Sequence, residues 1–223
     1  MEAWAKFPTK PIIEEKSLKY LIWKRHKSDG TAALLVLIAL AVKRNLDGKK
    51  KQPASSSVVT ATYDDIQALV AISRSKVSKG LALLAELKSI ERLKDDRSSY
   101  RLVGLDTKGG WAQLPQNRLM QHTGSPSDRI CAFEPFYLRA KSELDALKVY
   151  LLMIAFRDWR TGYAHIGYGK IMDYTGIAQR DIKKAKSHLI SLGLIYAEHD
   201  QEGETTKQSL RYKVIGLPMK GNQ

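Results

Sequence analysis

The segment Tyr63–Leu87, YDDIQALVAISRSKVSKGLALLAEL, decides how this chain is organised, because its pattern returns 105 residues later. The second copy, Tyr168–Leu192, reads YGKIMDYTGIAQRDIKKAKSHLISL. Each copy is preceded at a distance by a Trp-Ala-x-x-Pro motif, once at Trp4–Pro8 and once at Trp111–Pro115. A repeat of this length predicts a doubled structural unit, so fold and function are argued from the unit.

Each copy contains a short helix, expected at Asp64–Ala71 and Lys170–Thr175, followed by a turn and a longer helix. Ser73 is a typical N-cap for the first longer helix. One face of each longer helix is apolar, which predicts that it lies on a core; its residues are Val77, Gly80, Leu84 and Leu87 in one copy and Ile182, Ala185, Leu189 and Leu192 in the other. Two helices joined by a turn of three or four residues form a helix-turn-helix.

Two short β-rich runs around a polar turn follow each longer helix. They are Ile90–Leu93 with Tyr100–Leu105, and Leu194–His199 with Leu210–Leu217. A β-hairpin in this place is the wing of a winged helix. We therefore expect a mainly α fold with small β-wings, made of two tandem winged helix-turn-helix domains from an internal duplication. Domain 1 would be residues 1–106 (recognition helix about 73–88, wing about 93–100), and domain 2 residues 107–223 (recognition helix about 178–192, wing about 199–210).

An apolar helix is expected earlier in each unit. In the first unit Thr31 caps or opens it and it runs to about Asn45, and its counterpart is Leu147–Arg160. The polar loop that follows the first helix contains Lys49-Lys50-Lys51, and its composition is typical of a solvated segment. Trp4 and Trp111 are paired by the repeat, so we interpret them as structural anchors.

The composition favours a nucleic-acid partner. The chain of 223 residues has a formal net charge of +14 and a pI of about 9.7, although a ribosome-associated or membrane-surface protein would also be basic. The single cysteine, Cys131, excludes an internal disulfide and fits a reducing compartment. The longest apolar run, residues 31–42, is shorter than the roughly 20 residues that a membrane span needs, and residues 1–11 lack the apolar stretch of a signal peptide. We expect a soluble, cytoplasmic protein that does not associate with membranes.

The exposed face of each recognition helix holds the candidate DNA-binding residues. A helix-turn-helix inserts the first turns of its second helix into the major groove, where Arg and Lys reach guanine, Gln pairs with adenine and Ser adapts to several acceptors. Basic residues on one helix more often form a solvated face, but here the same face is basic in both copies. The candidates are Arg74, Ser75, Lys76, Ser78 and Lys79 in the first helix, and Gln179, Arg180, Lys183, Lys184 and Ser187 in the second.

The wings and the lysine-rich loop are expected to differ in their roles. Arg97 belongs to a moderately basic first wing and is a further candidate for DNA contact. The Lys49–Lys51 run either solvates its loop or forms a phosphate-contacting arm, in which case Lys50 contacts DNA. The second wing carries Asp200, Glu202 and Glu204, which phosphate would repel. We expect that wing to stay away from the DNA backbone or to face a protein partner.

No catalytic, metal-binding or cofactor-binding constellation is recognisable, so we expect a protein that is not an enzyme. The five histidines are scattered and lack metal-ligand spacing. Residues 164–171 resemble a phosphate-binding loop only in part, since Ala164 replaces the first glycine and Ile171 the final Ser or Thr. Cys131 is interpreted as a small buried hydrophobic residue, and Asp64-Asp65 as the cap of the short helix.

Two segments carry a resemblance to a known family. Ala146–Asp158 reads ALKVYLLMIAFRD, and Tyr168–Ile177 reads YGKIMDYTGI. Together they are similar to the winged-helix domains of plasmid and phage replication proteins, including replisome-organiser and primosome-loading types. The tandem arrangement also resembles plasmid replication initiators that contain two winged helices. The resemblance implies binding of repeated origin sites, melting of nearby DNA and recruitment of the host helicase or its loader; some such proteins also repress their own promoter.

The leading hypothesis is a sequence-specific double-stranded DNA-binding protein, monomeric or homodimeric, that initiates replication. Its recognition helices would read half-sites about 10 bp apart. A transcriptional regulator or plasmid-maintenance repressor is the alternative. A second alternative is a protein-interaction module in which only one winged helix binds DNA. No helicase-contact domain is recognisable at the C-terminal side, which puts helicase recruitment in question rather than DNA binding.

Overall fold

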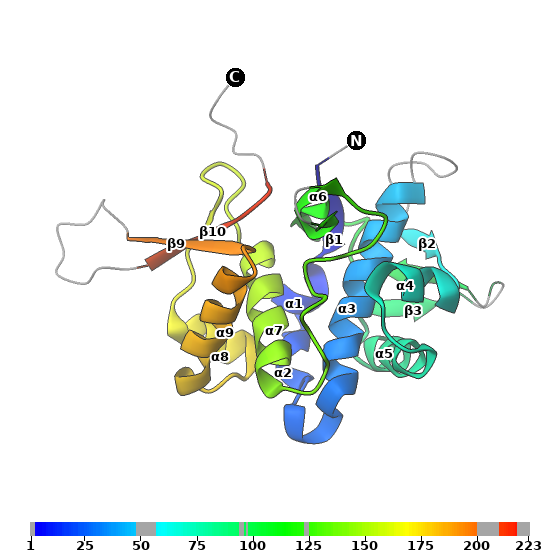
Figure 1. Ribbon diagram of the computed structural model, residues 1–223, viewed down its shortest axis with the longest axis horizontal. Coiled ribbons are helices and arrows are strands. Elements are labelled where there is room, and N and C mark those ends of the chain that lie inside the picture. The colour runs from blue at the N-terminus through cyan, green and yellow to red at the C-terminus, as the bar shows by residue number, and fades with distance from the viewer. Residues whose placement is uncertain are drawn as a thin grey trace.

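The computed structural model describes residues 3–47, 57–93, 96, 98–122, 125–199 and 210–217, and in these ranges the chain is mainly helical with small antiparallel sheets (Figure 1). The first half contains β1 (Ala5–Pro8), α1 (Lys10–Ile13), α2 (Ser17–Tyr20), α3 (Trp23–Asp47), β2 (Val58–Thr60), α4 (Tyr63–Val70), α5 (Arg74–Glu86), β3 (Ile90–Arg92) and β4 (Ser99–Leu102). The second half contains β5 (Trp111–Leu114), α6 (Gln116–Leu119), β6 (Gln121–His122), β7 (Ser125–Pro126), α7 (Lys141–Ala155), β8 (Tyr163–Ala164), α8 (Tyr168–Thr175), α9 (Gln179–Ser191), β9 (Ile195–His199) and β10 (Leu210–Val214).

The two halves repeat one arrangement of elements. Each has a long central helix (α3 or α7), a short strand, a helix pair and a β-hairpin, in that order. The short strand joins the hairpin as an outer strand, which gives the sheet orders β2-β4-β3 and β8-β10-β9. Tyr100 on β4 and Tyr212 on β10 occupy equivalent positions and are both buried. The duplication read from the sequence therefore extends to strand pairing and register.

The helix pairs lie close to where the periodicity predicted them. Ser73 is the N-cap of α5, with its hydroxyl accepting from the backbone N–H of Lys76. Asp65 forms a capping box with Thr62 at the start of α4, which confirms that the Asp64-Asp65 pair includes a helix-capping residue. The apolar faces of α5 and α9 pack inward, and Gly80 allows α5 to approach α3 because an added Cβ would lie 3.1 Å from Val36 and 3.3 Å from the Ala32 backbone.

The expected bounds of the central helices were wrong. Thr31 is buried within α3, which begins at Trp23 and contains a break at Lys27 (φ 48°, ψ −134°). The helix α7 begins at Lys141, six residues before the predicted start, because the Glu143 carboxylate accepts backbone N–H groups of Tyr137, Arg139 and Ala140. It ends at Ala155, and a tight turn follows in which Asp158 and Tyr163 are hydrogen-bonded. The apolar run covers the buried middle of α3, whereas in α7 it covers the C-terminal part of the helix and the expected range continued past the helix end.

The turn between the paired helices needs a left-handed residue in both halves. Gly176 supplies it after α8, with φ +67°. Ala71 occupies the equivalent place after α4, with φ +49°. A left-handed conformation costs an L-residue about 1–2 kcal/mol, whereas glycine adopts it without that cost. The first half therefore carries strain that the second half avoids.

Exchanging these two residue types should change stability in opposite directions. We expect Ala71→Gly to stabilise the protein by up to about 1 kcal/mol, the relief of strain being partly offset by the larger entropy of an unfolded glycine. We expect Gly176→Ala to destabilise it by about 1–2 kcal/mol. Chemical denaturation of the wild type and both variants measures these changes. If both substitutions change the free energy of unfolding in the same direction, the assignment of strain to Ala71 is contradicted.

The two halves pack on each other around a pseudo-twofold axis. The strands β1 and β5 pair antiparallel, and their register is symmetric: Ala5 pairs with Leu114, Lys6 with Gln113 and Phe7 with Ala112. The rings of Trp4 and Trp111 stack at 5.8 Å with an interplanar angle of 9°, which confirms their role as structural anchors. The helices α3 and α7 lie side by side at the centre, with α4 and α5 flanking α3 and α8 and α9 flanking α7 (Figure 1).

In each half, the segment that precedes the central helix contacts the helix pair of the other half; we call it the leading segment. The helix α2 packs against α8, where the Lys16 ammonium lies 2.7 Å from Asp173. In the reciprocal contact, the Ile130 N–H donates to the Leu69 carbonyl at the end of α4, at 2.8 Å. One hydrophobic cluster consequently runs through both halves, and Cys131 is buried as expected. The boundary expected at residue 106 falls in the turn between β4 and β5, but the two halves share a core.

Candidate nucleic-acid interface

The first turns of α5 present a basic surface that is partly neutralised by acidic neighbours. Arg74, Ser75, Ser78 and Lys79 are exposed. The Arg74 guanidinium lies 2.7 Å from Asp64 and 5.1 Å from the centre of the Tyr63 ring. The ammonium group of Lys79 lies 3.6 Å from Asp29. This helix therefore exposes cations that already have partners.

Lys76 differs from the other predicted contacts on α5. Its ammonium group binds both the hydroxyl of Ser28 and the carboxylate of Asp29, which lie near the start of α3. Its side chain is only 27% exposed. The structure thus gives Lys76 a role in joining α5 to α3, because helical periodicity turns it toward α3 rather than toward the outer face.

The first turns of α9 present a more open basic surface. Gln179, Lys183, Lys184 and Ser187 are exposed, and the side chain of Arg180 is 88% exposed. Among the described residues, neither Lys183 nor Lys184 has an ion-pair partner. The predicted contacts of the second copy are therefore brought together on one outward face, and this face is less neutralised than that of α5.

Lys186 on α9 points in the opposite direction. It is buried, and its ammonium group donates to the Tyr212 hydroxyl at 2.7 Å and lies 4.2 Å from the centre of the Tyr168 ring. Burial lowers its pKa from 10.5 to about 8. The equivalent position in the first half is the buried Leu81. Lys186 thus replaces apolar packing by a hydrogen bond between α9 and β10. The sequence did not reveal its inward direction, because Lys186 lies among other lysines.

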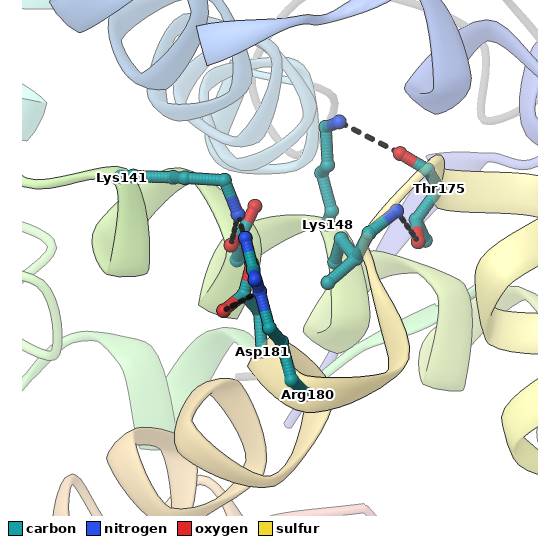
Figure 2. A network of polar contacts seen from close by, with 7 residues as sticks. Lys141, Lys148, Thr175, Arg180 and Asp181 are labelled. Carbon is teal, nitrogen blue, oxygen red and sulfur yellow. Dashed lines mark hydrogen bonds and ion pairs between the residues drawn. The ribbon is translucent and has the colours of Figure 1, made fainter.

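A polar network holds α9 against α7 (Figure 2). The Lys141 ammonium bridges Asp145 on its own helix and Asp181 in the first turn of α9, at 2.8 Å from the latter. Lys141 lowers the pKa of Asp181, whereas burial raises that of Asp145. Because Asp181 follows Arg180 directly, this bridge fixes the turn of helix that carries the exposed arginine.

Lys148 connects α7 to the last residue of α8, where the turn to α9 begins. Its buried ammonium group donates to the Thr175 carbonyl at 2.8 Å, and the Thr175 hydroxyl accepts the N–H of Ile177 (Figure 2). Burial lowers the pKa of Lys148 to about 8. Sequence reasoning missed this contact, although a lysine inside the apolar run ALKVYLL was a signal for it. The network sets the position of α9 relative to the core.

A cavity of about 630 Å³ opens between the start of α4 and the first hairpin. Its lining includes Arg74 with its ion-pair partner Asp64, Arg92, and Thr62, the N-cap residue of α4. Because Asp64 offsets the charge of Arg74, Arg92 and the helix N-terminus give the pocket its positive character. In the second half the matching positions hold Gln179 and Ala197, so this basic pocket belongs to the first half.

Three further predictions fall outside the described residues: the contacts of Lys50 and Arg97, and the repulsive tip formed by Asp200, Glu202 and Glu204. Within the described ranges no group of metal-ligating side chains is present, and no helix there is long and apolar enough to cross a membrane. No family model, curated protein or solved structure matches the chain.

Proposed function

We propose that each half of the chain is a winged helix and that the protein is a sequence-specific double-stranded DNA-binding protein. The order of elements in each half supports the first part: helix, strand, helix pair and hairpin, with the short strand beside the last one. In this proposal α5 and α9 are the recognition helices and the two hairpins are the wings. The net charge of +14 supports a polyanionic partner.

One observation carries the proposal: the first turns of both α5 and α9 are exposed and basic. A helix N-terminus favours anions, and the same turns contact base edges when a helix-turn-helix enters the major groove. The apolar sides of both helices are buried, so only these outward faces can contact a ligand. The face is basic in both halves although several of its residues differ, Arg74 being matched by Gln179 and Ser78 by Lys183.

The pseudo-twofold arrangement supports a paired site. The helices α5 and α9 flank the central helices on opposite sides (Figure 1). A monomer would then read two half-sites about 10 bp apart, as a dimer of single-domain proteins does. Because α5 offers Arg74 and Ser78 where α9 offers Gln179 and Lys183, the two half-sites should differ in sequence.

The two halves should contribute unequally to duplex affinity. The cations of α5 are paired with Asp29 and Asp64, and each pair must rearrange or remain partly neutralised when phosphate approaches. The lysines of α9 carry no such cost. The α9 face therefore supplies the larger electrostatic share, while Arg92 adds positive charge to the pocket beside the first wing.

The proposed biological role is replication initiation at a repeated origin site, with a host helicase or loader as partner. This role depends on the resemblance to plasmid and phage replication proteins. Selection of duplex DNA from a random library with the full-length protein, at near-physiological salt, tests the proposal. Paired half-sites are the expected result, and their position at an origin or at a promoter chooses between initiator and repressor. Recovery of no motif, with binding that vanishes as salt rises, would contradict sequence-specific recognition.

The full chain is the appropriate protein for this test. A fragment that contains only the second half would lose the β1 partner of β5, the Trp4–Trp111 stack and the α2 contact with α8. Loss of DNA binding by such a fragment would then reflect lost structure as well as lost contacts. Substitutions on α5 or α9 of the intact protein separate the two halves without this difficulty.

A further inference from the structure

The outer face of the sheet β8-β10-β9 differs from its counterpart in the first half. Cross-strand register places Tyr163, Lys213 and Tyr196 in one row across the three strands. The equivalent row in the first half is Val58, Arg101 and Glu91. There Arg101 pairs with Glu91 at 3.0 Å, which leaves the row neutral. The duplication therefore replaced an ion-paired row by a lysine between two tyrosines.

This row faces away from the core. Side chains alternate across a strand, and the intervening residues Tyr212, Ala164 and Ile195 are buried. The ring of Tyr196 is 54% exposed. Tyr163 and Tyr196 lie on strands two apart, so about 10 Å separates their backbones with Lys213 between them. Within this row the Arg211 guanidinium lies 4.3 Å from the centre of the Tyr163 ring, and the Tyr163 hydroxyl donates to Glu198. Tyr196 is therefore the ring of the row that is open to a partner.

The loop between α7 and β8 leads into the edge strand of this sheet, where Arg157 forms a β-bridge with Ala164. The loop rises next to the sheet in Figure 1 and carries Trp159, which is 63% exposed. Arg160 follows Trp159 and is also exposed. Among the described residues, Arg160 and Lys213 have no ion-pair partner, whereas Arg211 is paired with Glu198 at 3.5 Å. The sheet face and the adjoining loop therefore combine exposed aromatic rings with an excess of positive charge.

We infer that this face binds single-stranded nucleic acid, with unpaired bases stacked on Tyr196 and Trp159 and phosphates held by Lys213 and Arg160. Bases within a duplex are stacked on one another, so exposed rings can stack on the bases of an unpaired strand but not on those of a duplex. The positive charge selects a polyanion over an apolar peptide. One molecule would then hold a duplex on α5 and α9 and an adjoining single strand on this sheet; the duplex part rests on the proposed function, and the single-strand part does not.

Fluorescence anisotropy with a labelled oligothymidylate of about 20 nucleotides tests the inference on the full-length protein. Wild-type protein should bind it, and Tyr196→Ala and Trp159→Ala should each weaken binding by about 5- to 150-fold, the effect expected for one lost stacking contact. Tyr196→Phe keeps the ring and should bind like the wild type. Tyr137→Ala is the matched control, because Tyr137 is 77% exposed but lies outside the sheet.

A second readout follows the ring directly. Oligothymidylate should quench the fluorescence of Trp159 on binding, and Trp159→Phe should lack this component. Thermal denaturation verifies that each variant is folded. Binding of oligothymidylate that survives Tyr196→Ala, or its absence in the wild type, overturns the inference. If Tyr196→Ala loses as much affinity for duplex DNA as for oligothymidylate, the face belongs to the duplex interface and the inference is also overturned. A loss of duplex binding that is confined to α9 variants concerns only the proposed function.

Discussion

Replacing Lys183 and Lys184 together by alanine is expected to weaken duplex binding by about 10- to 100-fold near physiological salt. Both lysines are exposed on α9 and unpaired within the described part of the chain. Each phosphate contact releases condensed counterions, so losing two should also reduce the slope of log K against log salt by up to about 2. Anisotropy titrations of a selected duplex at several salt concentrations measure both quantities.

A charge-matched control separates this effect from the general charge of the protein. Lys10 and Lys108 lie on α1 and in the turn between β4 and β5, outside α5 and α9, and the double variant Lys10→Ala/Lys108→Ala loses the same formal charge. It should retain most of the affinity and of the salt slope. If both double variants behave alike, long-range charge alone accounts for binding, and the assignment of α9 to the groove fails.

The second large effect concerns the dependence of stability on pH. Lys148 is buried, and its pKa falls from 10.5 to about 8 in the folded protein. Between these values the unfolded chain binds a proton at this site that the folded chain does not bind. The contribution of Lys148 to the free energy of unfolding should therefore rise with pH from about 8 to 10.5, by up to about 3 kcal/mol.

The Lys148→Met variant isolates this contribution, since other lysines titrate in the same range. Chemical denaturation of both proteins between pH 7 and pH 10.5 gives the difference in the free energy of unfolding as a function of pH. The wild type should gain stability relative to the variant as pH rises. A difference that stays flat, or that falls with pH, would mean that Lys148 keeps its ordinary pKa despite its burial.

The elements that the sequence predicted well are those whose signals are local. The helix pairs α4–α5 and α8–α9 and the hairpin strands lie within a few residues of their expected bounds. Ser73 and Asp65 cap their helices as expected, because an N-cap and its N–H partner are three residues apart. The apolar stripes on α5 and α9 were readable for the same reason, since one face of a helix repeats every three or four residues.

Whether an individual lysine side chain points inward or outward depends on contacts between segments that are distant in the sequence. Lys76 and Lys186 look like their neighbours in the sequence, yet one binds Asp29 on α3 and the other the Tyr212 hydroxyl on β10. The early start of α7 similarly depends on Glu143 and the backbone of residues 137–140, which the apolar pattern does not include. Composition and periodicity carry no information about such partners.

The sequence by itself determined the duplication, the helix pairs, the hairpins and the basic outward faces of α5 and α9. Only the tertiary structure decided that the halves share one core through the β1–β5 pair and the exchanged leading segments, and that Tyr163, Lys213 and Tyr196 form one row. The physical reason is separation along the chain. Capping and periodicity act over a few residues, whereas strand register and packing between halves join residues whose relative positions are set only when the whole chain folds.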